Sequence, residues 1–161
     1  MARILVIYDS RTGNTEEMAR AVTEGAREAG AEVEVKRASE ARPEDLLGID
    51  GLILGSPTHF GSMSDAMKGF IDKSVRVRGK LEGKVGAAFT SSLYFDGGNE
   101  TTLLSLLQAM LMHGMIVVGD PIAVGGHYGV VAVGKPDERA LRACRALGRR
   151  VAELARKLSG G

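Results

Sequence analysis

The sequence contains a single cysteine, Cys144, and no tryptophan among its 161 residues. One cysteine excludes an intrachain disulfide and is typical of a reducing compartment, so we expect a cytoplasmic protein. The most apolar window, residues 103–118, is interrupted by serine, glutamine, histidine and glycine, and is too polar for a membrane span. The chain starts with one basic residue, Arg3, and then a strand-like run, which is not the pattern of a secretory signal.

A strong net charge is also missing. The chain has 21 basic and 20 acidic residues, which gives a formal net charge of +1. This balance gives no reason to expect nucleic acid or a membrane surface as a partner. Apolar residues make up 44% and charged residues 25%, as in a globular protein, and the length predicts one domain over residues 1–161.

Few residues are suited to metal or nucleophilic chemistry. His59, His113 and His127 have no metal-ligand spacing, and one cysteine cannot complete a site, so no metal is predicted. Cys144 lies on the apolar stripe of the last predicted helix, which indicates a core residue rather than a nucleophile. His113 ends a predicted helix, where an imidazole interacts well with the last carbonyl groups. The other two histidines lie in predicted loops.

Apolar runs alternate with helical patterns along the whole chain. The expected strands are Ile4–Tyr8, Val33–Val35, Gly51–Gly55, Val85–Phe89 and Met115–Val118. The expected helices are Thr15–Ala29, a short one at Pro43–Leu47, one with Met63, Met67, Phe70 and Ile71 on one face, Thr101–Met112, and one from about Pro136 to Leu158. This alternation predicts an α/β fold, with a parallel sheet covered on both faces. Five strands in about 160 residues favour a three-layer sandwich over an eight-fold barrel.

In such a sheet, ligands bind beyond the carboxyl ends of the strands, where the loops after Tyr8, Gly55 and Phe89 should converge. The first loop, Asp9–Thr15, places hydroxyl and backbone N–H groups at a helix N-terminus, which suits a phosphate group. Gly13 allows a close approach of the backbone or a positive φ. Without a ligand, the same residues would only cap the helix.

The second and third loops add different chemistry. Pro57, Thr58 and Gly61 provide a rigid turn with backbone donors in the second loop. Tyr94 and Phe95 bring two of the seven aromatic residues into the third loop. Their rings could pack against a planar heterocycle, or they could fill a local apolar gap.

These motifs resemble those of the flavodoxin family. Ser10–Thr15 is similar to the flavodoxin phosphate loop, and Gly55–Ser64 resembles the second flavin loop of the WrbA-like branch. Three further segments, Phe89–Ser92, Gly97–Glu100 and His113–Met115, are similar to segments of that branch in the same order, as is the pair Tyr128–Gly129. The resemblance implies a flavodoxin-like three-layer sandwich, with a five-stranded parallel sheet of order 2-1-3-4-5 that binds FMN non-covalently.

The resemblance also implies which residues contact FMN. At the phosphate we expect Ser10, Arg11, Thr12, Gly13, Asn14 and Thr15. One edge of the isoalloxazine would contact Pro57, Thr58, His59, Phe60 and Gly61, and the other edge Ser91, Ser92, Leu93, Tyr94, Phe95 and Gly97.

Three functions remain open at this point. The first is an electron carrier that exchanges electrons with a redox partner protein through FMN. The second is a WrbA-type NAD(P)H:quinone oxidoreductase, in which NADH or NADPH reduces FMN and a quinone accepts the electrons. For this enzyme, His113, or His127 and Tyr128, would position the nicotinamide or the quinone. The third is a module without redox activity that binds another phosphate-bearing ligand in the first loop.

The sequence departs from the WrbA-like pattern in length and in two loops. Only residues 38–50 lie between the second and third predicted strands, where WrbA-like enzymes carry an extra segment that belongs to their tetramer. A tetramer is therefore not predicted, and a homodimer is an alternative assembly. His59 replaces an arginine, and the bulky run Leu93–Asp96 replaces a glycine-rich stretch. Electron-carrier flavodoxins are strongly acidic, whereas this chain is nearly neutral.

Overall fold

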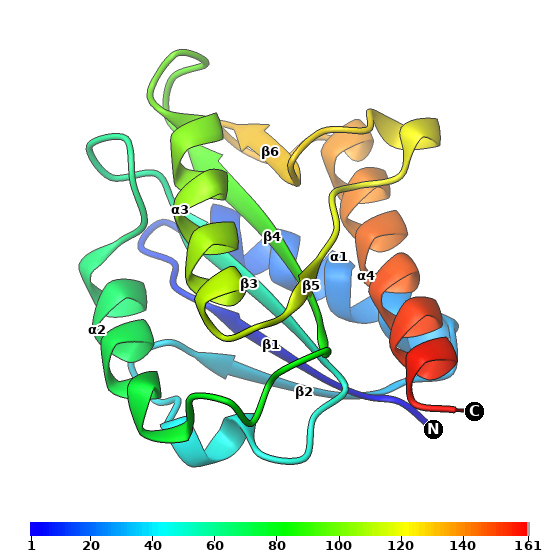
Figure 1. Ribbon diagram of the computed structural model, residues 1–161. Coiled ribbons are helices and arrows are strands. Elements are labelled where there is room, and N and C mark those ends of the chain that lie inside the picture. The colour runs from blue at the N-terminus through cyan, green and yellow to red at the C-terminus, as the bar shows by residue number, and fades with distance from the viewer. Residues whose placement is uncertain (161) are drawn as a thin grey trace.

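The computed structural model describes residues 1–160 and shows a three-layer α/β arrangement (Figure 1). The strands are β1 (Arg3–Tyr8), β2 (Glu32–Arg37), β3 (Gly51–Pro57), β4 (Val85–Ser92), β5 (Ile116–Val117) and β6 (Val130–Val133). The α-helices are α1 (Asn14–Glu28), α2 (Asp65–Lys73), α3 (Asn99–Met112) and α4 (Glu138–Leu158). The short 3₁₀ helices are η1 (Pro43–Leu46), η2 (Ser74–Val77) and η3 (Ile122–Val124).

The sheet is parallel and has the order β2-β1-β3-β4-β5, which confirms the predicted order. Two apolar cores lie on its two faces. One core joins the sheet to α1 and α4, and the other joins it to α2 and α3. The continuous apolar run of β1 is explained by burial on both faces, since Leu5 and Val6 are both buried and point to opposite cores. β2 is an edge strand and has alternating charged residues.

The fifth strand position is divided between two strands, which corrects the predicted single strand Met115–Val118. β5 pairs with the start of β4, where Val85 lies opposite Ile116, and β6 pairs with the end of β4, where Phe89 lies opposite Val130. The chain leaves the sheet between them. Pro121 has no N–H group to donate to a neighbouring strand. The carboxylate of Asp120 accepts hydrogen bonds from the backbone N–H groups six and seven residues further along the chain, and these bonds hold the connection in place.

The structure also differs from several predicted element boundaries. β4 continues to Ser92, so Ser91 and Ser92 lie in the strand and not in the following loop as predicted. The segment at Pro43 forms only a 3₁₀ turn. Ser64 caps α2 by accepting a hydrogen bond from Met67 N at 3.3 Å. Cys144 is buried, and burial raises the pKa of its thiol to about 12, as suits a core residue.

Two glycines allow α1 and α4 to pack backbone against backbone. A Cβ atom on Gly25 would collide with the carbonyl oxygen of Arg145, and one on Gly148 would collide with that of Val22. The close contact holds α1 firmly against the core, so the loop before α1 has a fixed position. The N-terminus and the C-terminal end of α4 lie at the other end of the sheet from the loops that follow β1, β3 and β4 (Figure 1).

No helix within residues 1–160 is long and apolar enough to cross a membrane. The same residues contain no group of three or more histidine, cysteine, aspartate and glutamate side chains placed to hold a metal ion.

His113 is buried at the C-terminal end of α3, where it contacts η2. Ser74 Oγ donates a hydrogen bond to Ile71 O at 2.6 Å, so it accepts one from the Nε2–H of His113 at 2.7 Å. The Nδ1 atom has no hydrogen-bond partner within the described residues. Burial, and the nearby positive charge of Arg78, lower the pKa of His113. The folded protein therefore holds this imidazole neutral.

We expect this histidine to make the protein less stable in mild acid. Its folded-state pKa is lowered, so the unfolded chain binds a proton first as the pH falls below about 6.5, and unfolding is favoured. His113→Gln should reduce this loss of stability, because glutamine does not titrate. Urea midpoints at pH 7.5 and 5.5 would measure the effect in both proteins. An equal decrease in the two proteins would contradict the assignment.

Candidate functional site

Hydrogen bonds join the three loops at the carboxyl ends of β1, β3 and β4. The loop after β1 is tied to β3, because Asp9 N donates to Gly55 O at 3.0 Å. Thr15 and Ser91 share a buried hydroxyl–hydroxyl hydrogen bond of 2.7 Å, which joins the start of α1 to the end of β4. Thr58 N donates to Ser91 O at 2.8 Å and joins the second loop to the third. The predicted convergence is thus present as a connected polar network.

The first loop curls around one hydroxyl group. Ser10 Oγ accepts hydrogen bonds from Gly13 N at 3.1 Å and from Glu16 N at 3.3 Å. Gly13 has a φ of +95°, and no atom lies near the position of a Cβ atom, so glycine is needed here for its backbone conformation and not for space. In the first turn of α1, the N–H group of Glu16 is thus bonded to Ser10, whereas no described residue accepts a hydrogen bond from the N–H groups of Asn14 and Thr15. An anion with several oxygen atoms fits these donors.

Arg37, at the end of β2, also holds the first loop, although the sequence pattern did not indicate it. Its guanidinium donates to Ser10 O and to Glu16 Oε1, both at 3.3 Å, and lies 5.2 Å from the centre of the Tyr8 ring. Tyr8 donates to the same carboxylate at 3.0 Å, and burial and Glu16 raise the pKa of Tyr8. Arg37 therefore offsets the negative charge of the Glu16 carboxylate, which lies close to the candidate anion site.

The second loop contains a tight turn with an unusual residue. His59 and Ser62 exchange two backbone hydrogen bonds of 2.9 and 3.1 Å. Between them, Phe60 and Gly61 have φ values of +49° and +75°, which define a turn that normally has asparagine and glycine. Phe60 is the only residue other than glycine with a positive φ among residues 1–160, and its ring is fully exposed. Such strain is typical of functional positions.

The third loop lies against the second. A Cβ atom on Gly98, whose φ is +102°, would meet Gly61 Cα, so the two loops touch through their backbones. Ser92 Oγ donates to Tyr94 O at 2.7 Å and shapes the start of the loop. The exposed fractions of the apolar side chains in this loop are 75% for Leu93, 70% for Tyr94 and 84% for Phe95.

Four large apolar side chains therefore protrude from two touching loops beside a polar network. Grouped exposed apolar side chains are costly in water and mark a place that a ligand or a partner covers. The arrangement provides anion donors at one end and aromatic rings at the other. It can hold a molecule that has a phosphate and a flat ring system.

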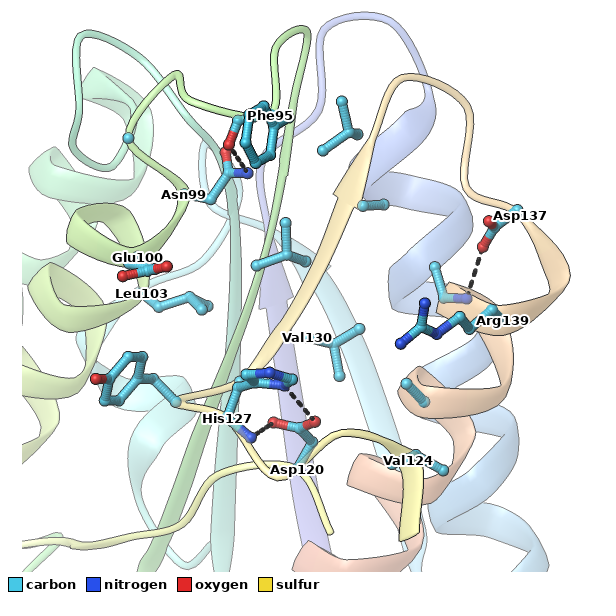
Figure 2. Close-up of a pocket in the computed structure, with 18 of the residues that line it drawn as sticks. Phe95, Asn99, Glu100, Leu103, Asp120, Val124, His127, Val130, Asp137 and Arg139 are labelled. Atoms are coloured by element: carbon cyan, nitrogen blue, oxygen red, sulfur yellow. Dashed lines mark hydrogen bonds and ion pairs between the residues drawn. The ribbon is translucent and has the colours of Figure 1, made fainter. Parts of the chain in front are cut away.

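The three candidate catalytic residues do not lie together. His113 lies beyond the last residue of α3, and this 14-residue helix is about 20 Å long, which separates His113 from the loops. His127 and Tyr128 lie in the connection between β5 and β6, where they line a cleft bounded by α3, β6 and α4 (Figure 2). Phe95 also lines this cleft, so it borders the third loop. Of the three candidates, His127 and Tyr128 line the cleft that borders the third loop, and His113 does not.

Comparison with known proteins gives consistent matches. Residues 6–94 match the family profile described as Flavodoxin. An NAD(P)H dehydrogenase (quinone) from Archaeoglobus fulgidus is 47% identical, over 98% of this chain and 100% of that protein. A flavodoxin from Aquifex aeolicus is 46% identical, over 95% of this chain and 86% of that protein. A solved flavodoxin, WrbA-like protein from Agrobacterium tumefaciens is 31% identical over 98% of this chain and 99% of that one, with a TM-score of 0.81.

The alignment with the Archaeoglobus fulgidus protein also shows a difference in length. It extends over 190 positions, whereas this chain has 161 residues. The relative therefore contains residues that have no counterpart here, although this chain matches it over its whole length.

Proposed function

This chain belongs to the flavodoxin family and is a flavodoxin-like redox protein, and we propose that its three joined loops bind FMN non-covalently. The observation that supports this most is the junction itself, with N–H donors around Ser10 and exposed rings at Phe60, Tyr94 and Phe95. When bound, FMN supplies the redox chemistry, because it accepts and donates one or two electrons. The protein binds the flavin, orients it and excludes water from its faces.

Each of the three loops would contact a different part of FMN. The residues Ser10–Thr15 would hold the phosphate, since they combine the N-terminus of α1 with hydroxyl groups. Pro57–Gly61 would line one edge of the flavin ring and Ser91–Gly97 the other, because these segments touch each other. Arg37 would offset the charge of Glu16, which would otherwise repel a phosphate.

Titration of the purified protein with FMN tests this proposal. We expect FMN fluorescence to fall as the flavin is taken up, with one flavin bound per chain. A protein that leaves FMN free, even when both are concentrated, would contradict the proposal. In that case the first loop would serve another phosphate-bearing ligand, which is the alternative without redox activity.

An NAD(P)H:quinone oxidoreductase is the second candidate, because a relative with this activity in its name matches the whole chain. In this function, NADH or NADPH would donate electrons, and His127 and Tyr128 could position a substrate from the side of the third loop. We assign His113 no role in this function, because it is buried against Ser74 at the far end of α3.

Anaerobic mixing of the FMN-loaded protein with NADH, and separately with NADPH, would distinguish an enzyme from a carrier. An enzyme should lose its visible flavin absorbance within seconds and regain it when benzoquinone is added. Unchanged absorbance with both nucleotides would favour a carrier that obtains electrons from a partner protein.

We also propose a cytoplasmic location and a homodimer. Light scattering of the FMN-loaded protein would measure the assembly.

A further inference from the structure

The two edges of the sheet differ in how they are protected against the addition of further strands. An edge strand exposes unpaired N–H and C=O groups, and proteins commonly protect such an edge with charged side chains or proline. β2 forms one edge, and four of its six residues are charged. β6 forms part of the other edge, and its four residues, Val130–Val133, are all apolar. The edge at β6 therefore lacks the usual protection.

Two residues of β6 direct their backbone groups away from the sheet. Within residues 1–160, β6 pairs only with β4. Gly134 N donates to Ser92 O at 2.8 Å, and alternate residues of a strand bond to the same neighbour. Val131 and Val133 therefore present their N–H and C=O groups to the open edge. An extended chain that joins a sheet forms hydrogen bonds to groups in this arrangement.

This edge lies in a groove and not on a flat surface. A cleft of about 690 Å³ is lined by all four residues of β6, by Leu103 of α3, and by Ala140 and Ala143 of α4 (Figure 2). Val130 and Ala132 are buried in the core that joins the sheet to α1 and α4, although they belong to an edge strand. α3 and α4 thus flank the edge on the two faces of the sheet, and a strand added to β6 would lie between them.

The groove is bounded at both ends. His127 and Tyr128, in the connection from β5, line one end, and Phe95 of the third loop lines the other. Figure 2 shows His127 and Phe95 near opposite ends of β6. β6 has four residues, and since a strand rises by about 3.3 Å per residue, its edge is about 13 Å long. An extended segment of roughly four to six residues fits this length.

The two sides of the groove carry opposite charges. Asp96 and Glu100 line the α3 side, and Lys135 and Arg139 line the α4 side; all four residues are exposed. Figure 2 shows Glu100 on one side of β6 and Arg139 on the other. Asp137 also lines the α4 side, but its carboxylate caps α4 by accepting a hydrogen bond from the first turn at 2.8 Å. The α4 side therefore favours an acidic side chain, and the α3 side a basic one.

A second folded copy of this chain does not fit the groove. In that copy, β6 lies in the same kind of groove, between its own α3 and α4. The helices of the two copies would meet before the two β6 edges came within the roughly 4.8 Å that separates neighbouring strands of a sheet. An extended segment carries no flanking helices, so it can reach the edge.

We propose that this groove binds an extended segment of a partner protein, which joins the sheet as an additional strand beside β6. The backbone of the segment bonds to Val131 and Val133, and its successive side chains point alternately toward α3 and α4. The side chains toward α3 are basic or apolar, and those toward α4 are acidic or apolar. The bound segment lies beside Phe95 of the third loop. This inference rests on the sheet edge and does not depend on the proposed flavin site.

Calorimetric titration with two peptides tests the side-chain pattern. The probe is a hexapeptide with blocked ends, in which lysine, leucine and lysine alternate with glutamate, valine and glutamate. The control peptide exchanges the last two residues, so that each face of the extended chain carries both charges. We expect the probe to bind with a Kd between about 1 μM and 1 mM, and the control to bind about fivefold more weakly. No binding of the probe, or equal binding of the two peptides, would overturn the proposal.

Methylation of single peptide nitrogens tests the backbone contacts. In an added strand, neighbouring residues direct their N–H groups to opposite sides, so only one of the leucine and valine nitrogens of the probe faces β6. Methylating that nitrogen should weaken binding about tenfold, and methylating its neighbour should have little effect. Equal affinities of the two methylated peptides would exclude strand addition.

Proline substitutions at the two edges of the sheet test the location. Val131→Pro removes an N–H group that faces the open edge and that the pairing with β4 does not use, so the probe should bind about tenfold more weakly. Val35→Pro is the matched control on β2. Ala38 N donates to Tyr8 O, so the N–H group of Val35 faces the open edge of β2 in the same way. Equal probe affinities in the two variants would overturn the proposal, as would a dimer that only Val131→Pro disrupts, since the edge would then bind a second copy.

Amide hydrogen exchange of the unmodified protein tests the same contacts without a substitution. The N–H groups of Val131 and Val133 should exchange more slowly when the probe is bound, because they gain hydrogen-bond acceptors. The N–H group of Ala132 faces β4 and should change little. The result should be the same with and without FMN, which separates this site from the proposed flavin site. Unchanged exchange at both valines in the presence of saturating probe would overturn the proposal.

Discussion

Replacing Thr12 by glutamate should weaken FMN binding by about a hundredfold or more. Thr12 is exposed in the first loop, within the curl of backbone around Ser10, where we place the FMN phosphate. A carboxylate at this position would repel the phosphate and compete for the same N–H groups. Like charges a few ångströms apart at a protein surface repel by roughly 3 kcal/mol, which corresponds to this loss in affinity.

Thr12→Gln is the control that separates charge from shape. Glutamine has the size of glutamate without the charge, so it should lose much less affinity than Thr12→Glu. Fluorescence titrations with FMN at low and high salt would measure both variants, and the charge effect should shrink as salt is added. Unfolding midpoints of the flavin-free variants should match that of the unmodified protein, because the side chain is exposed. Similar affinities for both variants would show that the phosphate binds elsewhere.

Replacing Phe60 by asparagine should produce two opposite effects. The flavin-free protein should become more stable by about 1 kcal/mol, because asparagine tolerates a positive φ far better than phenylalanine does. FMN affinity should fall about tenfold, because the exposed ring that we place against the flavin is lost. The backbone strain at Phe60 would then lower the stability of the flavin-free protein and hold the ring in the position that binds the flavin.

Gly61→Ala provides the comparison for this turn. Gly61 has a φ of +75° and its nearest neighbour to an added Cβ atom is 3.5 Å away, so alanine would add backbone strain with little crowding. It should therefore lower the stability of the flavin-free protein, while Phe60→Asn raises it. Thermal unfolding with and without FMN would measure both. A Phe60→Asn variant with lower stability and full FMN affinity would contradict this role for the ring.

The parallel sheet and the meeting of the three loops could be predicted from local patterns in the sequence, whereas the strand order was predicted from the resemblance to the flavodoxin family. Apolar runs marked the strands, and the alternation with helices fixed the parallel direction. Predicting β6 was harder. Its four residues, Val130–Val133, follow a glycine-rich loop, and each pairs with a residue of β4 that lies 41 positions earlier in the chain.

In the candidate site, too, residues in local motifs could be predicted, and residues that reach the site from distant segments could not. Ser10, Gly13 and Thr15 were predicted as phosphate-binding residues from a local motif, and they lie between β1 and the start of α1. Arg37 was missed because it reaches the first loop across the sheet, from the end of β2. His113 was considered for catalysis although its local position at a helix end already explained it. Only the direction of α3 shows how far it lies from the loops.

The position of the termini has a practical consequence. The N-terminus and the C-terminal end of α4 lie at the opposite end of the sheet from the second and third loops (Figure 1). A domain fused to either end, or a tag that attaches the protein to an electrode, would therefore leave the proposed flavin site uncovered. With FMN bound at the proposed site, such a linker would lie at one end of the molecule and the flavin at the other.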